Sequence, residues 1–170
     1  MPVTTETPKK FKRGSLYLET GFEYGHSAQA ALDAGFEDVI SIEMSTLYVL
    51  DGKKRFHGRP VIIHLSDSVN GLRRVLPTVL EPATFYLDAH PNTSSPILDE
   101  LAVIKEYGIK DHTILVDDRR LMHGIWNNVV EEQVHAALLA INPSYEILLV
   151  EGHVPEDIIV ARADLRASPE

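Results

Sequence analysis

Five short apolar runs, each followed by a helical pattern, constrain the fold of this chain more than any other feature of its sequence. The runs are near-continuous rather than alternating, as expected for strands that helices cover on both faces. They span residues 16–18, 39–42, 61–65, 84–87 and 113–116, and two further runs, 147–150 and 158–160, follow them. This order predicts an α/β, doubly wound, Rossmann-like fold with a seven-stranded, mostly parallel sheet. The last run follows a turn around Pro155, so we expect one antiparallel strand near the C-terminus.

The segments between the runs carry helix signals. Apolar residues recur at helical spacing, and they place helices over about residues 28–35, 45–56, 72–79, 96–107 and 130–141. Pro77 is placed to end the third of these helices early. Ser95 and Pro96 predict the cap and the first residue of the fourth, and Gly108 predicts its end.

Length and charge limit the domain organisation and the partners. A chain of 170 residues is long enough for one core, and we expect a single domain over residues 15–163, a solvated basic arm over 1–14 and a polar tail over 164–170. With 16 Lys and Arg against 25 Asp and Glu, the formal charge is -9. This charge disfavours nucleic acid and anionic membranes as partners. The sequence has no cysteine, signal peptide or long apolar run, so we expect a cytoplasmic protein without thiolate chemistry.

Acidic residues lie at or near the end of every one of the first five strands. They are Glu19, Glu43, Asp67, Asp88 and the pair Asp117-Asp118. In an open α/β sheet, ligands bind outside the carboxyl ends of the strands, so these acids should converge on one crevice. Any single one could instead cap the following helix, but five successive cases favour a site.

Two glycines follow the first strand. Gly21 and Gly25 lie in a strand-to-helix turn, where glycine lets the backbone approach a ligand closely. Glu43, at the end of the second strand, is placed to accept both hydroxyls of a ribose. The phosphate-gripping pattern G-x-G-x-x-G is absent, so a ligand with a ribose but no pyrophosphate fits better than a dinucleotide.

These segments together resemble a class I S-adenosylmethionine-dependent methyltransferase. The resemblance rests on residues 16–27, 40–43, 64–68, 86–90 and 115–118 and extends from about residue 15 to 162. It implies that the cofactor-binding residues are Glu19, Gly21, Gly25, Ser27, Glu43, Asp67 and Ser68. Of these, Glu19 and the two glycines would surround the methionine part, Glu43 would hold the ribose, and Asp67 with Ser68 would lie near the adenine.

The acids of the fourth and fifth strands are similar to those of the divalent-metal-dependent O-methyltransferases. The resemblance implies that Asp88, Asp117 and Asp118 bind a divalent cation, most simply Mg²⁺. Three carboxylates also make a hard oxygen site in their own right. The alternative is that Asp117 and Asp118 cap the next turn and pair with the arginines that follow them.

The chain departs from that group around the acceptor. The lysine expected as base beyond the fourth-strand aspartate is missing, and His90 is the candidate replacement as catalytic base. There is almost no extension before the first strand and no insertion before the last two. We therefore expect an open acceptor site, or one completed by another subunit of a homo-oligomer.

The sequence thus predicts a methyltransferase that uses S-adenosylmethionine, with metal-assisted O-methylation of a small-molecule or sugar-like acceptor. Two alternatives remain open. One is a nicotinamide- or nucleotide-dependent Rossmann enzyme, against which the missing third glycine argues. The other is a non-catalytic module that binds the cofactor with the same fold.

Overall fold

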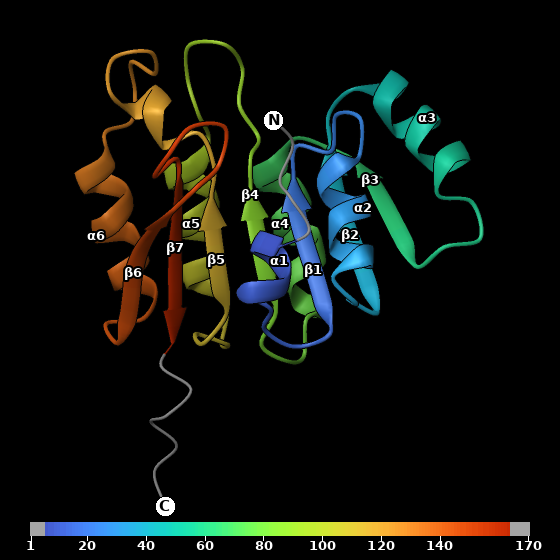
Figure 1. Ribbon diagram of the computed structural model, residues 1–170, viewed down its shortest axis with the longest axis horizontal. Helices are drawn as coiled ribbons and strands as arrows, with labels where there is room; N and C mark the ends of the chain where they lie inside the picture. The colour runs from blue at the N-terminus through green and yellow to red at the C-terminus, as the bar shows by residue number, and fades with distance from the viewer. Residues whose placement is uncertain (1–5, 164–170) are drawn as a thin grey trace, which may run out of the picture.

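The computed structural model describes residues 6–163, and these residues form one sheet with helices on both faces (Figure 1). The strands are β1 (Leu16–Thr20), β2 (Asp38–Glu43), β3 (Val61–Leu65), β4 (Thr84–Leu87), β5 (Thr113–Val116), β6 (Tyr145–Val150) and β7 (Ile158–Ala163). The helices are α1 (Glu6–Lys10), α2 (His26–Asp33), α3 (Thr46–Arg55), α4 (Ser68–Val75), α5 (Ile97–Glu106) and α6 (Glu131–Ile141). Two 3₁₀ turns, η1 (Leu76–Thr78) and η2 (Arg119–Met122), complete the elements. The polar tail predicted for residues 164–170 lies outside the described residues, as do residues 1–5 of the predicted arm.

The sheet has the predicted architecture. Its strand order is β3-β2-β1-β4-β5-β7-β6, and β1 to β5 pair in parallel. Strand β7 runs antiparallel to both β5 and β6, which confirms one antiparallel strand near the C-terminus. The strand order reverses between β1 and β4, where a doubly wound sheet leaves a crevice at the carboxyl ends of its strands.

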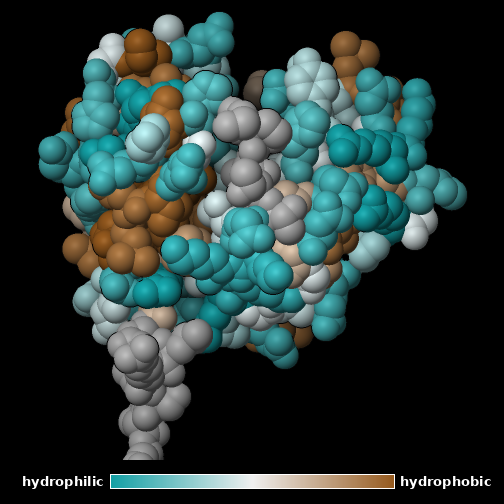
Figure 2. Space-filling model, viewed as in Figure 1, coloured by the Kyte–Doolittle hydropathy of each residue, from teal (hydrophilic) through white to brown (hydrophobic). Residues whose placement is uncertain are grey.

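Two apolar clusters hold the helices against the sheet. One cluster joins α4, α5 and α6 to one face, through side chains such as Leu72, Leu101 and Leu138. The other joins Phe11, α2 and the buried side of α3 to the opposite face. In Figure 2, apolar side chains gather over β6 and β7 on the face that α1 and α2 cover elsewhere. Leu148 and Val150 of β6 are only partly buried there.

The β3 strand is less buried than its continuous apolar sequence predicts. Ile62 is 57% exposed and Leu65 is 49% exposed, because β3 is an edge strand of the sheet. The fourth predicted helix also begins one residue later than expected. Pro96 is its cap rather than its first residue, and the Ser95 hydroxyl accepts a hydrogen bond from the Ile97 amide at 3.3 Å.

The described part of the N-terminal arm packs against the sheet through Phe11, while its lysines are exposed as predicted. Residues 6–10 form α1, and Phe11 is 4% exposed within the cluster on that face of the sheet. The Arg13 side chain hydrogen-bonds the Asp111 carbonyl at 3.1 Å and forms an ion pair with the carboxylate of that residue. The basic residues of the arm predicted a solvated segment. The burial of Phe11 instead fixes the arm against the sheet. No helix among residues 6–163 is long and apolar enough to cross a membrane.

Candidate functional site

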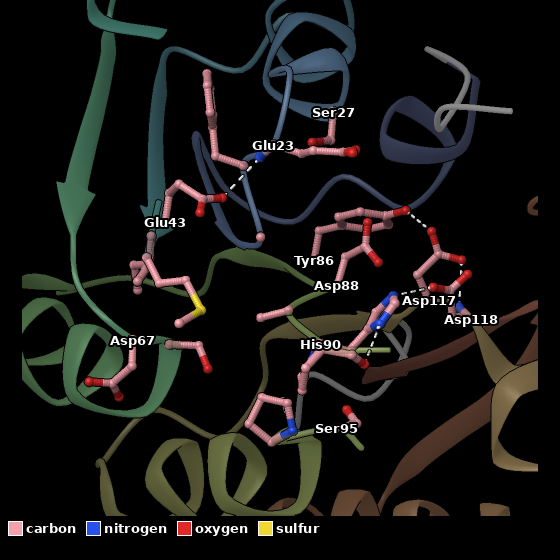
Figure 3. A pocket seen from close by; sticks show the side chains of 18 of the residues that line it. Glu23, Ser27, Glu43, Asp67, Tyr86, Asp88, His90, Ser95, Asp117 and Asp118 are labelled. Atoms are coloured by element: carbon pink, nitrogen blue, oxygen red, sulfur yellow. Dashed lines mark hydrogen bonds and ion pairs between the residues drawn. The ribbon is translucent and has the colours of Figure 1, made fainter. Parts of the chain in front are cut away.

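A cavity of about 940 Å³ opens at the carboxyl ends of the parallel strands, at the reversal of strand order. Such a volume suits a cofactor together with a small second ligand. Segments following β1, β2, β3, β4 and β5 all contribute to its wall. Figure 3 shows their side chains turned toward one space. The crevice predicted from the strand-end acids is therefore present.

The turn after β1 brings the backbone close to the cavity. Gly21 lines it with a φ of +83°, and its amide donates a hydrogen bond to the Ile42 carbonyl at 2.9 Å. Ser27, at the start of α2, also lines it. Gly25 does not. It has a φ of +69° and lies against the rings of Phe22 and Phe56, so it shapes the turn rather than the cavity wall.

Glu43 lies in the cavity wall as the ribose prediction requires. Its side chain is 7% exposed, and its two oxygens accept hydrogen bonds from the backbone amides of Glu23, at 3.0 Å, and Ser45, at 2.6 Å (Figure 3). Each carboxylate oxygen has a further lone pair to offer. The protein thus fixes the orientation of this carboxylate before any ligand arrives.

Glu19 lies beneath the cavity and is not part of its wall. It is fully buried, and the Ser41 hydroxyl donates a hydrogen bond to it at 2.5 Å. Burial raises its pKa to about 7, against the opposing effect of hydrogen bonds from Ser27 and Ser41. The structure therefore places Glu19 where it supports the turn through Ser27 instead of touching a ligand.

Asp67 and Ser68 line the cavity at the start of α4. Both oxygens of Asp67 accept hydrogen bonds from Asn70. One comes from the backbone amide of Asn70 and the other from its side-chain amide, each at 2.9 Å. These hydrogen bonds hold the pKa of the exposed Asp67 carboxyl below its usual value. The capping alternative is thus realised for Asp67, and Ser68, which is 8% exposed, lies against the cavity beside it.

The acids that follow β4 and β5 differ in their partners. Asp88 lines the cavity, and no described residue hydrogen-bonds its carboxylate. Burial, followed by the charges of Asp117 and Asp118, raises its pKa well above the usual range. Asp117 accepts a hydrogen bond from the Tyr86 hydroxyl and another from the Asp118 amide at 2.7 Å. Burial raises the pKa of Asp117 as well.

Asp118 is paired on both oxygens. One lies 2.6 Å from Nε2 of His90 and the other 2.6 Å from a guanidinium nitrogen of Arg120. Although burial opposes them, these contacts hold the pKa of Asp118 below its usual value, and the hydrogen bond to Asp118 raises the pKa of His90. Nδ1 of His90 lies 3.1 Å from the Pro91 carbonyl, which can only accept. Both ring nitrogens of His90 thus face an acceptor, so the Asp118 contact occupies Nε2, the nitrogen that the predicted base would otherwise offer to the cavity.

Asp157 belongs to this group and was missed from the sequence. It precedes β7, is 1% exposed, and accepts hydrogen bonds from both the amide and the guanidinium of Arg120. An antiparallel strand begins at the end of the sheet where its parallel neighbours finish. The residues that begin β7 therefore lie beside the carboxyl ends of the parallel strands. The position of Asp157 directly before the predicted antiparallel strand is the sequence signal that could have identified it.

The sequence matches no family model and no curated protein, whereas its fold matches solved structures. A methyltransferase of Podospora anserina bound to S-adenosylhomocysteine (SAH) matches with a TM-score of 0.65 and 16% identity, over 94% of this chain and 76% of that one. An O-methyltransferase of Bacillus cereus in complex with SAH gives a TM-score of 0.71 and 13% identity, over 94% and 78% of the two chains. The chain has the class I S-adenosylmethionine-dependent methyltransferase fold. Spermidine synthase of Thermotoga maritima also matches, with a TM-score of 0.62 and 13% identity over 87% of this chain and 53% of that one, so the fold alone leaves the transferred group open.

Within this methyltransferase fold, the predicted metal ligands Asp88, Asp117 and Asp118 are not one cluster. Ligand atoms approach within 4.8 Å of one another in two other sets, Asp88 with His90 and Asp118, and Asp117 with Asp118 and Asp157. Both sets share Asp118, whose oxygens are already paired. The predicted pairing of Asp118 with a following arginine is realised by Arg120. The donor set as arranged does not fit Mg²⁺, which requires free oxygen ligands in near-octahedral geometry.

A buried acid that the sequence prediction overlooked lies close to the cavity. Glu100 of α5 is 0% exposed, and its carboxylate lies against the hydroxyls of Ser68 and Thr20. Burial raises its pKa to about 7, which the hydroxyls of Ser68 and Thr20 offset only in part. Its position three residues after Ile97 and four before Ile104 is the sequence signal that places it on the buried face of the helix.

Proposed function

We propose that this protein transfers the methyl group of S-adenosylmethionine to an oxygen of a small, polar acceptor. The observation that carries the proposal is the Glu43 carboxylate, which two backbone amides orient at the cavity wall. In this fold such an acid is placed to accept the hydroxyls of an adenosyl ribose. The Gly21 turn lies beside it and offers close backbone approach to the rest of the donor.

The reaction is an in-line displacement at carbon. The sulfonium donor supplies an activated methyl group, so a C–S bond breaks, a C–O bond forms, and the acceptor hydroxyl gives up its proton. Asp88 is the group placed to receive that proton, because its carboxylate opens on the cavity without a hydrogen-bond partner among the described residues. His90 and Arg120, at the same end, are placed to bind polar groups of the acceptor. The cation predicted from the sequence has no step in this proposal.

Binding of SAH tests the donor site. We expect SAH to stabilise the protein in a thermal-shift or calorimetric titration, and Glu43→Ala to weaken binding by about 2 kcal/mol, or roughly thirtyfold, through lost charge-assisted hydrogen bonds. Glu37→Ala is the matched control, since Glu37 is an exposed glutamate in the turn before β2. This variant should bind SAH as the parent does.

The same titration with NAD and ADP separates the alternatives. If NAD stabilises the protein and SAH does not, the nicotinamide-dependent alternative replaces the proposal. Binding of SAH without methyl transfer to any of a panel of hydroxylated acceptors would favour the non-catalytic module. Loss of SAH binding in Glu37→Ala as severe as in Glu43→Ala would show that the acid at β2 has no special role.

We also propose a homo-oligomer in which a second copy covers the acceptor end. Exposed apolar side chains near the cavity mouth support this proposal. Tyr24 and Met44 line the cavity but are 57% and 75% exposed, and Leu47 of α3 is 73% exposed. Apolar groups gathered at one rim favour burial against a partner surface.

Leu47→Glu is expected to shift the protein from dimer to monomer in light scattering without loss of folded stability, because this side chain is mostly exposed within one copy. Leu80→Glu is the control, since Leu80 is 84% exposed and lies before β4, at the amino ends of the parallel strands and away from the cavity. A parent protein that is monomeric at every concentration would remove the proposal.

A further inference from the structure

We propose that the acidic edge of the cavity is closed by a cation of the chain itself, the Arg120 guanidinium, and that it therefore takes no divalent metal. Arg120 and Asp157 then act as positioning residues, which hold Asp118 and, through it, His90. The proposal concerns the same cavity as the proposed function. It is tested by cation binding, which does not depend on whether methyl transfer occurs.

The Arg120 guanidinium contacts two of the three carboxylates that could together bind a cation. One of its nitrogens contacts both Asp118, at 2.6 Å, and Asp157, while the Arg120 amide donates to Asp157 at 3.1 Å. Asp157 is itself held by its backbone, because its carbonyl accepts a hydrogen bond from the Arg119 amide at 2.8 Å. The arginine thus joins the loop after β5 to the start of β7.

The His90 side chain completes the pairing of Asp118. Nε2 of His90 contacts the Asp118 oxygen that Arg120 does not contact. The His90 ring lies against the Trp126 ring, with centroids 5.2 Å apart. Trp126 is 5% exposed, so it limits the positions the imidazole can adopt. Asp118 adopts a left-handed backbone conformation with a φ of 60°. Such a conformation persists where surrounding contacts impose it, and the contacts of Asp118 with Arg120 and His90 are such contacts.

A divalent ion would have to displace the Arg120 guanidinium. The all-oxygen set is Asp117, Asp118 and Asp157, and Arg120 pairs with two of its three carboxylates. Removal of one partner from a buried ion pair leaves an uncompensated charge, which is strongly unfavourable. Loss of the Arg120 side chain should therefore create the cation site that the parent protein lacks.

Calorimetric titration with MnCl₂ and with MgCl₂ tests this directly. We expect no binding up to millimolar concentration in the parent, and binding tighter by about tenfold or more in Arg120→Ala, through the acids left unpaired. Arg120→Lys keeps the positive charge and should behave as the parent. Arg119→Ala is the matched control, because the Arg119 guanidinium contacts Glu131 at 2.8 Å and not the three acids. Circular dichroism confirms that each variant is folded, and Arg120→Gln replaces Arg120→Ala if the latter does not fold.

Two results would overturn the proposal. One is Mn²⁺ or Mg²⁺ binding by the parent protein that Asp118→Asn abolishes. The other is a folded Arg120 variant with no gain in cation binding over the parent. SAH titration of the same samples keeps the two proposals apart, since a protein that binds neither SAH nor metal contradicts only the proposed function.

Discussion

Replacement of Glu100 by glutamine is expected to raise the free energy of unfolding by about 3 kcal/mol at about pH 8.5. Glu100 is fully buried, and its pKa is raised by burial from 4.5 to about 7. The folded state therefore binds the proton more tightly than the unfolded state, and stability falls as the pH rises from about 4.5 to above 7. Glutamine resembles the neutral acid in shape and can use the hydroxyls of Ser68 and Thr20 as acceptors.

The measurement is urea denaturation of parent and variant across this pH range. The difference between them should shrink to below about 1 kcal/mol near pH 5, where the parent carboxyl is mostly protonated when folded. Buried Glu19 contributes a similar pH dependence to both proteins, so it cancels in the difference. Glu106→Gln, at the exposed end of α5, controls for surface charge and should change stability by less than about 0.5 kcal/mol. A difference between parent and Glu100→Gln that does not vary with pH would contradict the assignment.

Substitution of Gly21 by alanine is expected to lower the free energy of unfolding by about 3 kcal/mol and to abolish most SAH binding. Gly21 has a φ of +83°, and a Cβ built there would lie 2.6 Å from the Asp88 carbonyl oxygen. The Asp88 backbone has little freedom to move away, because its amide donates to the Thr20 carbonyl at 3.1 Å. A side chain at this position would therefore separate the segments that follow β1 and β4.

Gly58 provides the matched control for backbone strain. Its φ of +74° is similar, but no atom lies within 4 Å of a Cβ built there. Gly58→Ala should lose about 1 kcal/mol, which measures the conformational effect alone. Denaturation curves of the two variants thus isolate the steric clash at Gly21. Equal losses in both variants would show that the close approach of the two strand ends is not limiting.

The β sheet could be predicted almost completely from the sequence. Near-continuous apolar runs and helical spacing are local signals. They predicted the number of strands, the parallel direction of most of them and the antiparallel strand after Pro155. They could not report which strand lies at an edge, so the exposure of Ile62 and Leu65 was not foreseen. Phe11 likewise shows that one aromatic side chain can bury a segment whose composition is basic.

The position of each acid along the chain determined that a ligand cavity lies at the carboxyl ends of the strands, with Glu43 in its wall. Only the tertiary structure decided which acids are free and which are paired. Asp88 and Asp118 look alike in the sequence, yet Asp118 is paired with His90 and Arg120 and Asp88 is not. The partners of a carboxylate come from segments far apart in the chain, as Asp157 does, and their distance in space follows from packing rather than from local sequence. The full burial of Glu100 depends on the same packing. Helical spacing indicates which face of a helix is turned inward, but only the neighbouring elements determine how completely a side chain on that face is covered.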